Sequence, residues 1–203
     1  MDDERSSSSS GSMADGAEHE QLVKGLTFET ARRHLTQQFG ERAWQSLMDD
    51  LPRRTRSLFD EAQTSEWYPE AELRRFIHVL HAQLAEGDDE RFAEIARALA
   101  LAGISRFFRM VVGLASARFV LLKVPVVWKR LRQGPAKLHT EIADDARVLV
   151  HYENYRYCRD PIYRQLSIAN CQALVVAATN TVPPAAVLRH DSRSMTLAFE
   201  LLK

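Results

Sequence analysis

Hydrophobic residues recur at helical spacing along the first two thirds of the chain, so amphipathic helices are expected there. The first run predicts a helix from Thr27, a candidate N-cap, to Leu51, because Pro52 follows and cannot continue it. A second helix is expected between the turn-like segment 67–69 and Gly87, and a third over residues 88–114.

The next segment, SARFVLLKVPVVWKRL over residues 116–131, is apolar yet carries four basic side chains. A membrane-spanning helix needs ~20 residues with almost no charge, so this segment predicts a buried scaffold helix and no transmembrane segment. Ser116 can cap this helix and Gly134 can end it, while Pro125 either kinks it or opens its second half. The residues expected to pack inward are Phe119, Leu122, Val126 and Val127.

Beyond Pro135 the hydrophobic period changes from helical to alternating, which is typical of strands. A helix from Asp160-Pro161 to Asn180 separates two predicted pairs of strands. The strands are expected at 137–142, 147–153, 186–190 and 195–201. The predicted fold class is therefore α+β, with a helical N-terminal two thirds packed on a C-terminal antiparallel ββ-α-ββ sheet unit.

The composition of the chain limits the classes of partner and the cellular location that are expected. Lysine plus arginine and aspartate plus glutamate number 27 each, so no net field favours nucleic acid as a partner. Residues 1–20 are acidic and serine-rich and lack the apolar stretch of an export signal, which predicts a disordered tail and a cytoplasmic protein. Residues 21–203 are expected to form a single α+β binding domain.

Several short stretches carry a family resemblance: residues 24–28, 67–69, 108–113, Trp128 and 195–200. With them the chain resembles an uncharacterised paralogous family abundant in myxobacteria, which is similar to the vinyl-reductase domain and to Bet-type subunits of the TRAPP vesicle-tethering complex. Haem-binding nitric-oxide sensors are more distant relatives by fold. The resemblance implies a mixed α/β domain that binds small apolar ligands in some relatives and protein partners in others.

The chemistry-bearing residues do not indicate a metal or a cofactor. Some vinyl-reductase-like sensors hold zinc with several cysteines, whereas this chain has only Cys158 and Cys171, which we interpret as small buried hydrophobes. The stretch 155–159 is similar to the Tyr-x-Ser-x-Arg motif of the haem sensors but has Tyr157 in place of serine, and no matching proximal histidine is evident. His78 and His81 could share a metal by their spacing, but no third ligand follows on that face.

These observations predict a non-enzymatic sensory or regulatory module that encloses a small apolar ligand between the central helices and the C-terminal sheet. The alternative is a protein-protein interaction adaptor with a filled core, expected as a homodimer, and a haem or gas sensor is the third possibility. An enzyme ranks below these, because the chain has no phosphate loop, nucleophile elbow or zincin motif. A cavity of ~300 Å³ or more would favour the ligand-binding module over the adaptor. The residues expected to line it are Phe107, Met110, Phe119, Trp128, Tyr152 and Tyr157.

Overall fold

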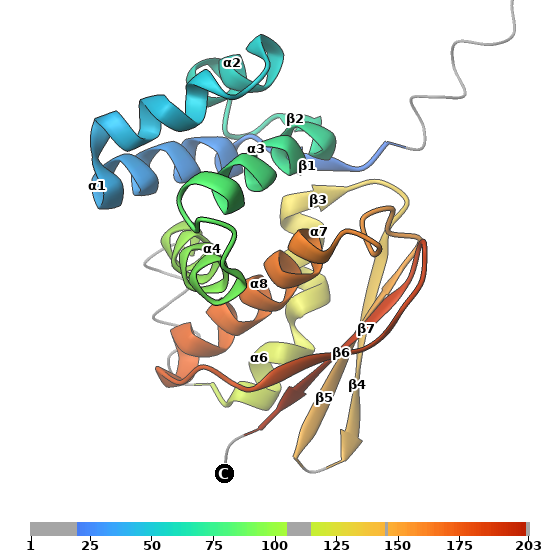
Figure 1. The fold of residues 1–203 in the computed structure, drawn as a ribbon. Helices are drawn as coiled ribbons and strands as arrows, with labels where there is room; N and C mark the ends of the chain where they lie inside the picture. The colour runs from blue at the N-terminus through green and yellow to red at the C-terminus, as the bar shows by residue number, and fades with distance from the viewer. Residues whose placement is uncertain (1–19, 105–114, 145, 202–203) are drawn as a thin grey trace, which may run out of the picture.

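The computed structural model describes residues 20–104, 115–144 and 146–201 of the chain. Four helices form its N-terminal part (Figure 1). They are α1 (Leu26–Asp49), α2 (Arg53–Glu61), α3 (Glu70–Gln83) and α4 (Asp89–Gly103). The helix predicted before residues 67–69 and the two predicted after them are present as α1, α3 and the described part of α4, and α2 is an addition.

Helix α2 was not predicted, because its sequence RRTRSLFDE is mostly polar and buries only Thr55 and Phe59. Phe59 nevertheless joins an aromatic cluster, with its ring centroid 5.3 Å from Phe28, 5.2 Å from Trp44 and 4.6 Å from Phe76. Edge-to-face and tilted pairs of this kind stabilise a core beyond the area that they bury. The aromatic cluster therefore holds α1, α2 and α3 together.

Helix α4 begins where the sequence indicated, because the Asp88 side chain caps it by accepting a hydrogen bond from the Arg91 backbone N–H at 2.7 Å. The helix ends at Gly103, since Ile104 is already extended, at φ −76° and ψ 114°. The predicted continuation of this helix to residue 114 falls on residues 105–114, which lie outside the described part of the chain.

The apolar segment after residue 115 forms two short helices, α6 (Ala117–Leu122) and α7 (Val124–Leu131). Pro125 lies in the first turn of α7, so of the two roles expected for it the structure shows the second, in which it opens the second half of the segment. The inward packing predicted for Phe119 and Val126 is wrong, because these side chains are 53% and 51% exposed. The helix is interrupted at Lys123, which changes the direction of α7 relative to α6. A single pattern of helical spacing therefore does not predict which residues of the two helices pack inward.

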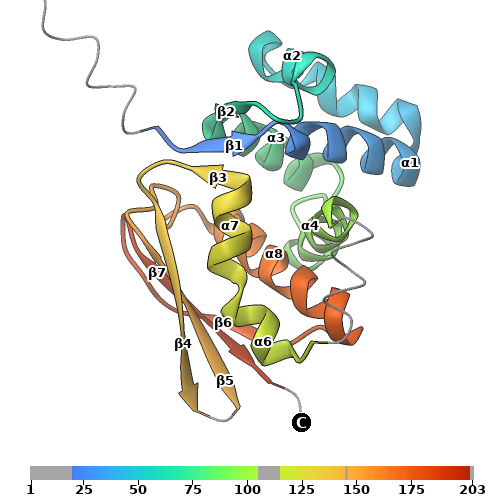
Figure 2. The same ribbon diagram turned by 180° about the vertical axis from the view of Figure 1, so that it is seen from behind.

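The predicted C-terminal strands form a four-stranded antiparallel sheet in the order β4-β5-β7-β6. Helix α8 (Pro161–Thr179) connects its two hairpins, as the sequence indicated. Helices α6, α7 and α8 lie on one side of this sheet (Figures 1 and 2). The strands are β4 (Lys137–Asp144), β5 (Arg147–Glu153), β6 (Ala185–His190) and β7 (Met195–Glu200).

A second, three-stranded sheet joins the two parts of the chain, and the sequence did not predict it. Its strands are β1 (Leu22–Lys24), β2 (Trp67–Pro69) and β3 (Arg132–Gln133), in the order β2-β1-β3. Strands of two or three residues are too short to show an alternating period, which is why 67–69 was interpreted as a turn. The pairing of Val23 with Arg132 brings the end of β1 alongside the end of α7.

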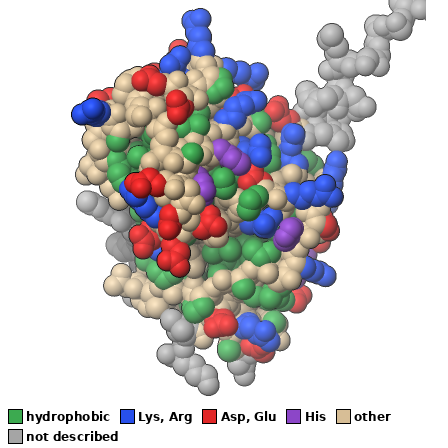
Figure 3. Space-filling model, viewed as in Figure 1, with side chains coloured by type: hydrophobic (Ala, Val, Ile, Leu, Met, Phe, Trp, Pro, Cys, Tyr) green, Lys and Arg blue, Asp and Glu red, His purple; other side chains and the backbone are tan. Residues whose placement is uncertain are grey.

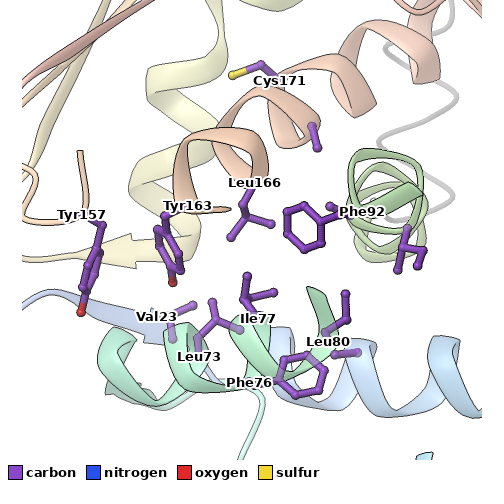
Figure 4. Packing of buried hydrophobic residues seen from close by; sticks show 14 of the residues in the cluster. Val23, Leu73, Phe76, Ile77, Leu80, Phe92, Tyr157, Tyr163, Leu166 and Cys171 are labelled. Carbon is purple, nitrogen blue, oxygen red and sulfur yellow. The ribbon is translucent and has the colours of Figure 1, made fainter. Parts of the chain in front are cut away.

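The hydrophobic core is continuous across the helical part and the sheet. Figure 4 shows Ile77 of α3, Phe92 of α4 and Leu166 of α8 pointing toward one another. The inner face of the sheet continues this core with Val148, Val150 and Phe199, which are fully buried. Within the described residues, no helix is long and apolar enough to span a membrane.

Candidate functional site

A cavity of about 460 Å³ lies among the helices, with walls from α1, α3, α4, α7 and α8. This volume is within the range of ~300–1,000 Å³ that is typical of small-molecule sites. The sequence placed such a cavity between the central helices and the C-terminal sheet, but among the described strands of that sheet only β5 reaches it, through Tyr152. The apolar residues of its wall include Leu26, Ala31, Leu73, Phe76, Ile77, Ala96, Leu99, Val124, Val127, Leu131, Leu166 and Leu174.

The structure brings together two of the six residues predicted to line a pocket, Trp128 and Tyr152. Tyr157 is buried beside Tyr163, with ring centroids 4.8 Å apart, and does not line the cavity. Phe119 does not line it either, because α6 directs this ring to the surface. Phe107 and Met110 lie outside the described residues.

Trp128 lies on the face of α7 that forms one wall of the cavity. Val124, Val127 and Leu131 share this face through their three- and four-residue spacing. The indole packs edge-to-face on Tyr152 and Tyr155, at centroid distances of 5.4 and 5.3 Å. Tyr152 and Tyr155 therefore fix the orientation of the indole, and the part of the indole that they leave uncovered faces the cavity.

Few polar groups reach into the cavity, and two of them lie next to each other. The Tyr152 hydroxyl and the Cys171 thiol are 3.9 Å apart. Burial raises the pKa of Cys171 to about 12, and burial likewise raises the pKa of Tyr152 well above its ordinary value. Both groups are therefore neutral at physiological pH, so the cavity contains no thiolate or phenolate nucleophile at this position.

Thr30 of α1 supplies a further polar atom in the cavity wall. Its hydroxyl oxygen is buried and has no hydrogen-bond partner among the described residues. A buried polar atom without a partner costs about 1–3 kcal/mol, so such atoms are uncommon in folded proteins.

Next to the cavity, a buried ion pair links the helical part to the rest of the chain. The guanidinium of Arg132 donates to the Glu70 carboxylate at 2.7 Å, and the hydroxyls of Tyr155 and Tyr163 donate to the same oxygen at 3.1 and 3.4 Å. Burial raises the pKa of Glu70, while Arg132 and the two hydroxyls oppose that shift. Figure 4 shows the hydroxyl of Tyr163 directed toward α3 and β1. We call Glu70, Arg132, Tyr155 and Tyr163 the buried polar cluster.

The buried polar cluster could not be predicted from the sequence, because Glu70 and Arg132 are 62 residues apart. The one available signal was the stretch 155–159, which we compared with a haem-sensor motif. In the structure, Tyr155 of this stretch is directed at Glu70, and it does not line the cavity.

A second polar cluster lies at the start of α8. Asp160 caps this helix and also accepts hydrogen bonds from Arg74 at 2.5 Å and from His78 at 2.7 Å. His78 therefore connects α3 to α8 through Asp160. Among the described residues, no group of three or more His, Cys, Asp or Glu side chains is arranged to hold a metal ion.

Comparisons with known proteins define the class of fold. No family model matches the chain, and no curated protein matches it. An unliganded Fe(II) H-NOX protein from K. algicida superposes with a TM-score of 0.63 at 9% identity, covering 89% of this chain and 97% of that chain. An H-NOX protein from S. oneidensis in the Fe(II)NO state gives a TM-score of 0.61 at 15% identity, with coverages of 89% and 100%.

An oxygen-binding H-NOX domain related to soluble guanylate cyclases gives a TM-score of 0.60 at 11% identity, covering 89% of this chain and 96% of that chain. The chain therefore has an H-NOX-like α+β fold. This agrees with the haem-NO-binding part of the resemblance drawn from the sequence. The vinyl-reductase and TRAPP part of that resemblance receives no support from these structures.

Because the names of these structures refer to haem and Fe(II), we compared the cavity with the requirements of a haem site. No histidine of the described residues lines it, and the sequence of residues 105–114 contains no histidine. Cys171 and Tyr152 are the cavity side chains that could ligate iron as anions. The described donor set of the cavity does not fit a histidine-ligated haem.

Proposed function

We propose that this chain is a non-enzymatic sensory or regulatory module that holds a small apolar molecule in the cavity between α1, α3, α4, α7 and α8. The observation that carries the proposal is the cavity of about 460 Å³, which has a mainly apolar wall and a neutral hydroxyl and thiol inside it. Its size favours the ligand-binding module over an adaptor with a filled core. Homodimer formation and a cytoplasmic location stay predictions.

Native mass spectrometry of the purified protein, together with titration by the neutral fluorescent probe Nile red, tests the proposal. Gly103→Leu is the matched variant, because a Cβ at Gly103 meets only Thr30, at 3.8 Å, so the fold has room for the added bulk. We expect this variant to keep the melting temperature and to weaken Nile red binding at least ~10-fold, as a filled pocket should. Equal binding by the variant and the wild type would contradict the proposal.

A haem or gas sensor is the second candidate, favoured by the similarity of the fold to H-NOX proteins. Addition of haem to the purified protein distinguishes this candidate function from the proposed one. If the cavity takes an apolar ligand, haem should associate weakly and without a defined stoichiometry. A stoichiometric complex with a sharp Soret band, lost in Gly103→Leu, would favour the haem sensor instead.

Trp128 provides a more local test of the cavity wall. Trp128→Phe should keep the free energy of unfolding within about 1–2 kcal/mol, as swaps between large apolar side chains often do, and should alter the affinity for Nile red. Trp44→Phe is the control, because Trp44 packs between Phe59 and Phe76 and does not line the cavity. If both variants bind the probe as the wild type does, Trp128 is only a packing residue.

A further inference from the structure

All the charged side chains that the described residues contribute to the cavity wall are basic. They are Lys24, Arg130 and Arg132, and none of the described lining residues is Asp or Glu. Arg132 is neutralised by Glu70 at 2.7 Å. The described part of the wall, which is mainly apolar with a few neutral polar side chains, thus has positive charges and no negative charge.

Lys24 and Arg130 have no carboxylate partner among the described residues. The Lys24 ammonium donates to the backbone carbonyl of Ser65 at 2.7 Å and lies 4.3 Å from the centre of the Trp67 ring, both of which are uncharged groups. Arg130 is exposed at the end of α7 and has no hydrogen bond or ion pair within the described part of the chain. Neither positive charge is therefore paired with a carboxylate of the described residues.

The fold brings the backbones of Lys24 and Arg130 to the same end of the cavity, while the Lys24 ammonium itself is directed at Ser65 and Trp67. The pairing of Val23 with Arg132 places the end of β1, and with it Lys24, alongside the end of α7. Helix α1 begins there, at Leu26, with no side-chain cap on its first turn. The positive end of its dipole adds to the field of Lys24. Figure 3 shows that lysine and arginine side chains gather over the part of this face where Figure 1 places β1, β2 and β3.

The charges of the wall favour a charged ligand over an uncharged one. Thr30 is 94% buried and its hydroxyl oxygen is not accessible from the cavity, so this hydroxyl does not select the ligand. An uncharged apolar ligand would leave Lys24 and Arg130 without a counter-charge.

We propose that the ligand of this cavity is an apolar monocarboxylate, whose carboxylate lies at the end formed by Lys24, Arg130 and the first turns of α1, and whose apolar part lies against α4, α7 and α8. This inference rests on the proposed function and adds the chemical class of the ligand. A carboxylate matches the positive sign of the charges at this end of the cavity, and an apolar body matches the rest of the lining.

Displacement of Nile red by three molecules of equal chain length tests the inference: decanoate, decanol and decylammonium. Because charge-assisted hydrogen bonds are stronger than neutral ones, we expect decanoate to bind about 10-fold more tightly than decanol, and decylammonium to bind most weakly. The preference for decanoate should shrink at high salt, since Lys24 and Arg130 are partly exposed.

The double variant Lys24→Gln/Arg130→Gln should lose most of the preference for decanoate while its affinity for decanol stays the same. Lys129→Gln is the matched control, because Lys129 is in the same turn of α7 and does not line the cavity. Equal binding of decanoate and decanol to the wild type would overturn this inference and leave the proposed function intact. Displacement by none of the three, together with no Nile red binding, would overturn the proposed function itself.

Discussion

Arg132→Met is expected to lower the free energy of unfolding by about 3–5 kcal/mol, the largest effect that we anticipate from a single substitution in this chain. Glu70 is fully buried, and its carboxylate accepts from Arg132 at 2.7 Å. Without the guanidinium, the carboxylate keeps only the hydroxyls of Tyr155 and Tyr163, at 3.1 and 3.4 Å. Urea denaturation at neutral pH measures the loss.

The dependence of this loss on pH follows from the same carboxyl. Burial already raises the pKa of Glu70, and removal of Arg132 removes the largest opposing influence. A carboxyl whose pKa is raised in the folded state destabilises the fold above its unfolded pKa and ceases to do so once it is protonated. The loss in Arg132→Met should therefore shrink as the pH falls.

A second substitution separates charge from packing. Glu70→Gln/Arg132→Met removes the buried charge along with its partner, and replacing both partners of a buried pair is often close to neutral. We expect the double variant to recover at least half of the stability that Arg132→Met loses. If it recovers nothing, the cost arises from the lost packing of Arg132 on Trp128, which lies 5.3 Å from the guanidinium.

Asp160→Asn is expected to lower the free energy of unfolding by about 2 kcal/mol at neutral pH. One carboxylate oxygen accepts from Arg74 and His78, and the other accepts from the backbone N–H groups of Ile162 and Tyr163 at 3.1 and 3.3 Å. Asparagine remains a good N-cap, so the loss reports mainly the charge. The side chains of Arg74 and His78 are 42% and 37% exposed, which keeps the expected value below that of a fully buried pair.

The pH dependence of this second effect has the opposite sign. Burial favours a raised pKa for Asp160, but the hydrogen bonds from His78, Arg74 and the Tyr163 N–H outweigh it and lower the pKa below its ordinary value. A carboxyl with a lowered folded pKa stabilises the fold above its unfolded pKa of ~3.9 and loses that contribution as the pH falls through the folded value. The wild type and Asp160→Asn should therefore converge in acid.

Asp89→Asn is the matched control for Asp160→Asn. Asp89 also contacts a histidine, with His81 Nε2 at 3.0 Å, but its side chain is 63% exposed. Exposed pairs contribute about 0–1 kcal/mol, so this variant should unfold almost as the wild type does. Equal losses in the two variants would show that solvent exposure does not distinguish these carboxylates.

The sequence alone determined the features that depend on neighbouring residues. Proline cannot continue a helix, so Pro52 and Pro125 marked real boundaries, and Asp160-Pro161 marked the start of α8. The shared face of Val124, Val127, Trp128 and Leu131 likewise followed from helical spacing alone. Local steric restrictions and hydrophobic periodicity depend only on residues that are close in the sequence. They can therefore be predicted without knowledge of the fold.

Only the tertiary structure decided which elements meet. The two-residue strand β3 has no period of its own and exists because Arg132 pairs with β1 across more than a hundred residues of chain. Thr30 of α1 lines the same cavity as residues of α4, α7 and α8. Glu70 forms an ion pair with Arg132, which is 62 residues away in the sequence. Such contacts depend on how whole helices pack. The packing free energy is a sum over many weak contacts between distant residues, so no single stretch of the sequence specifies it.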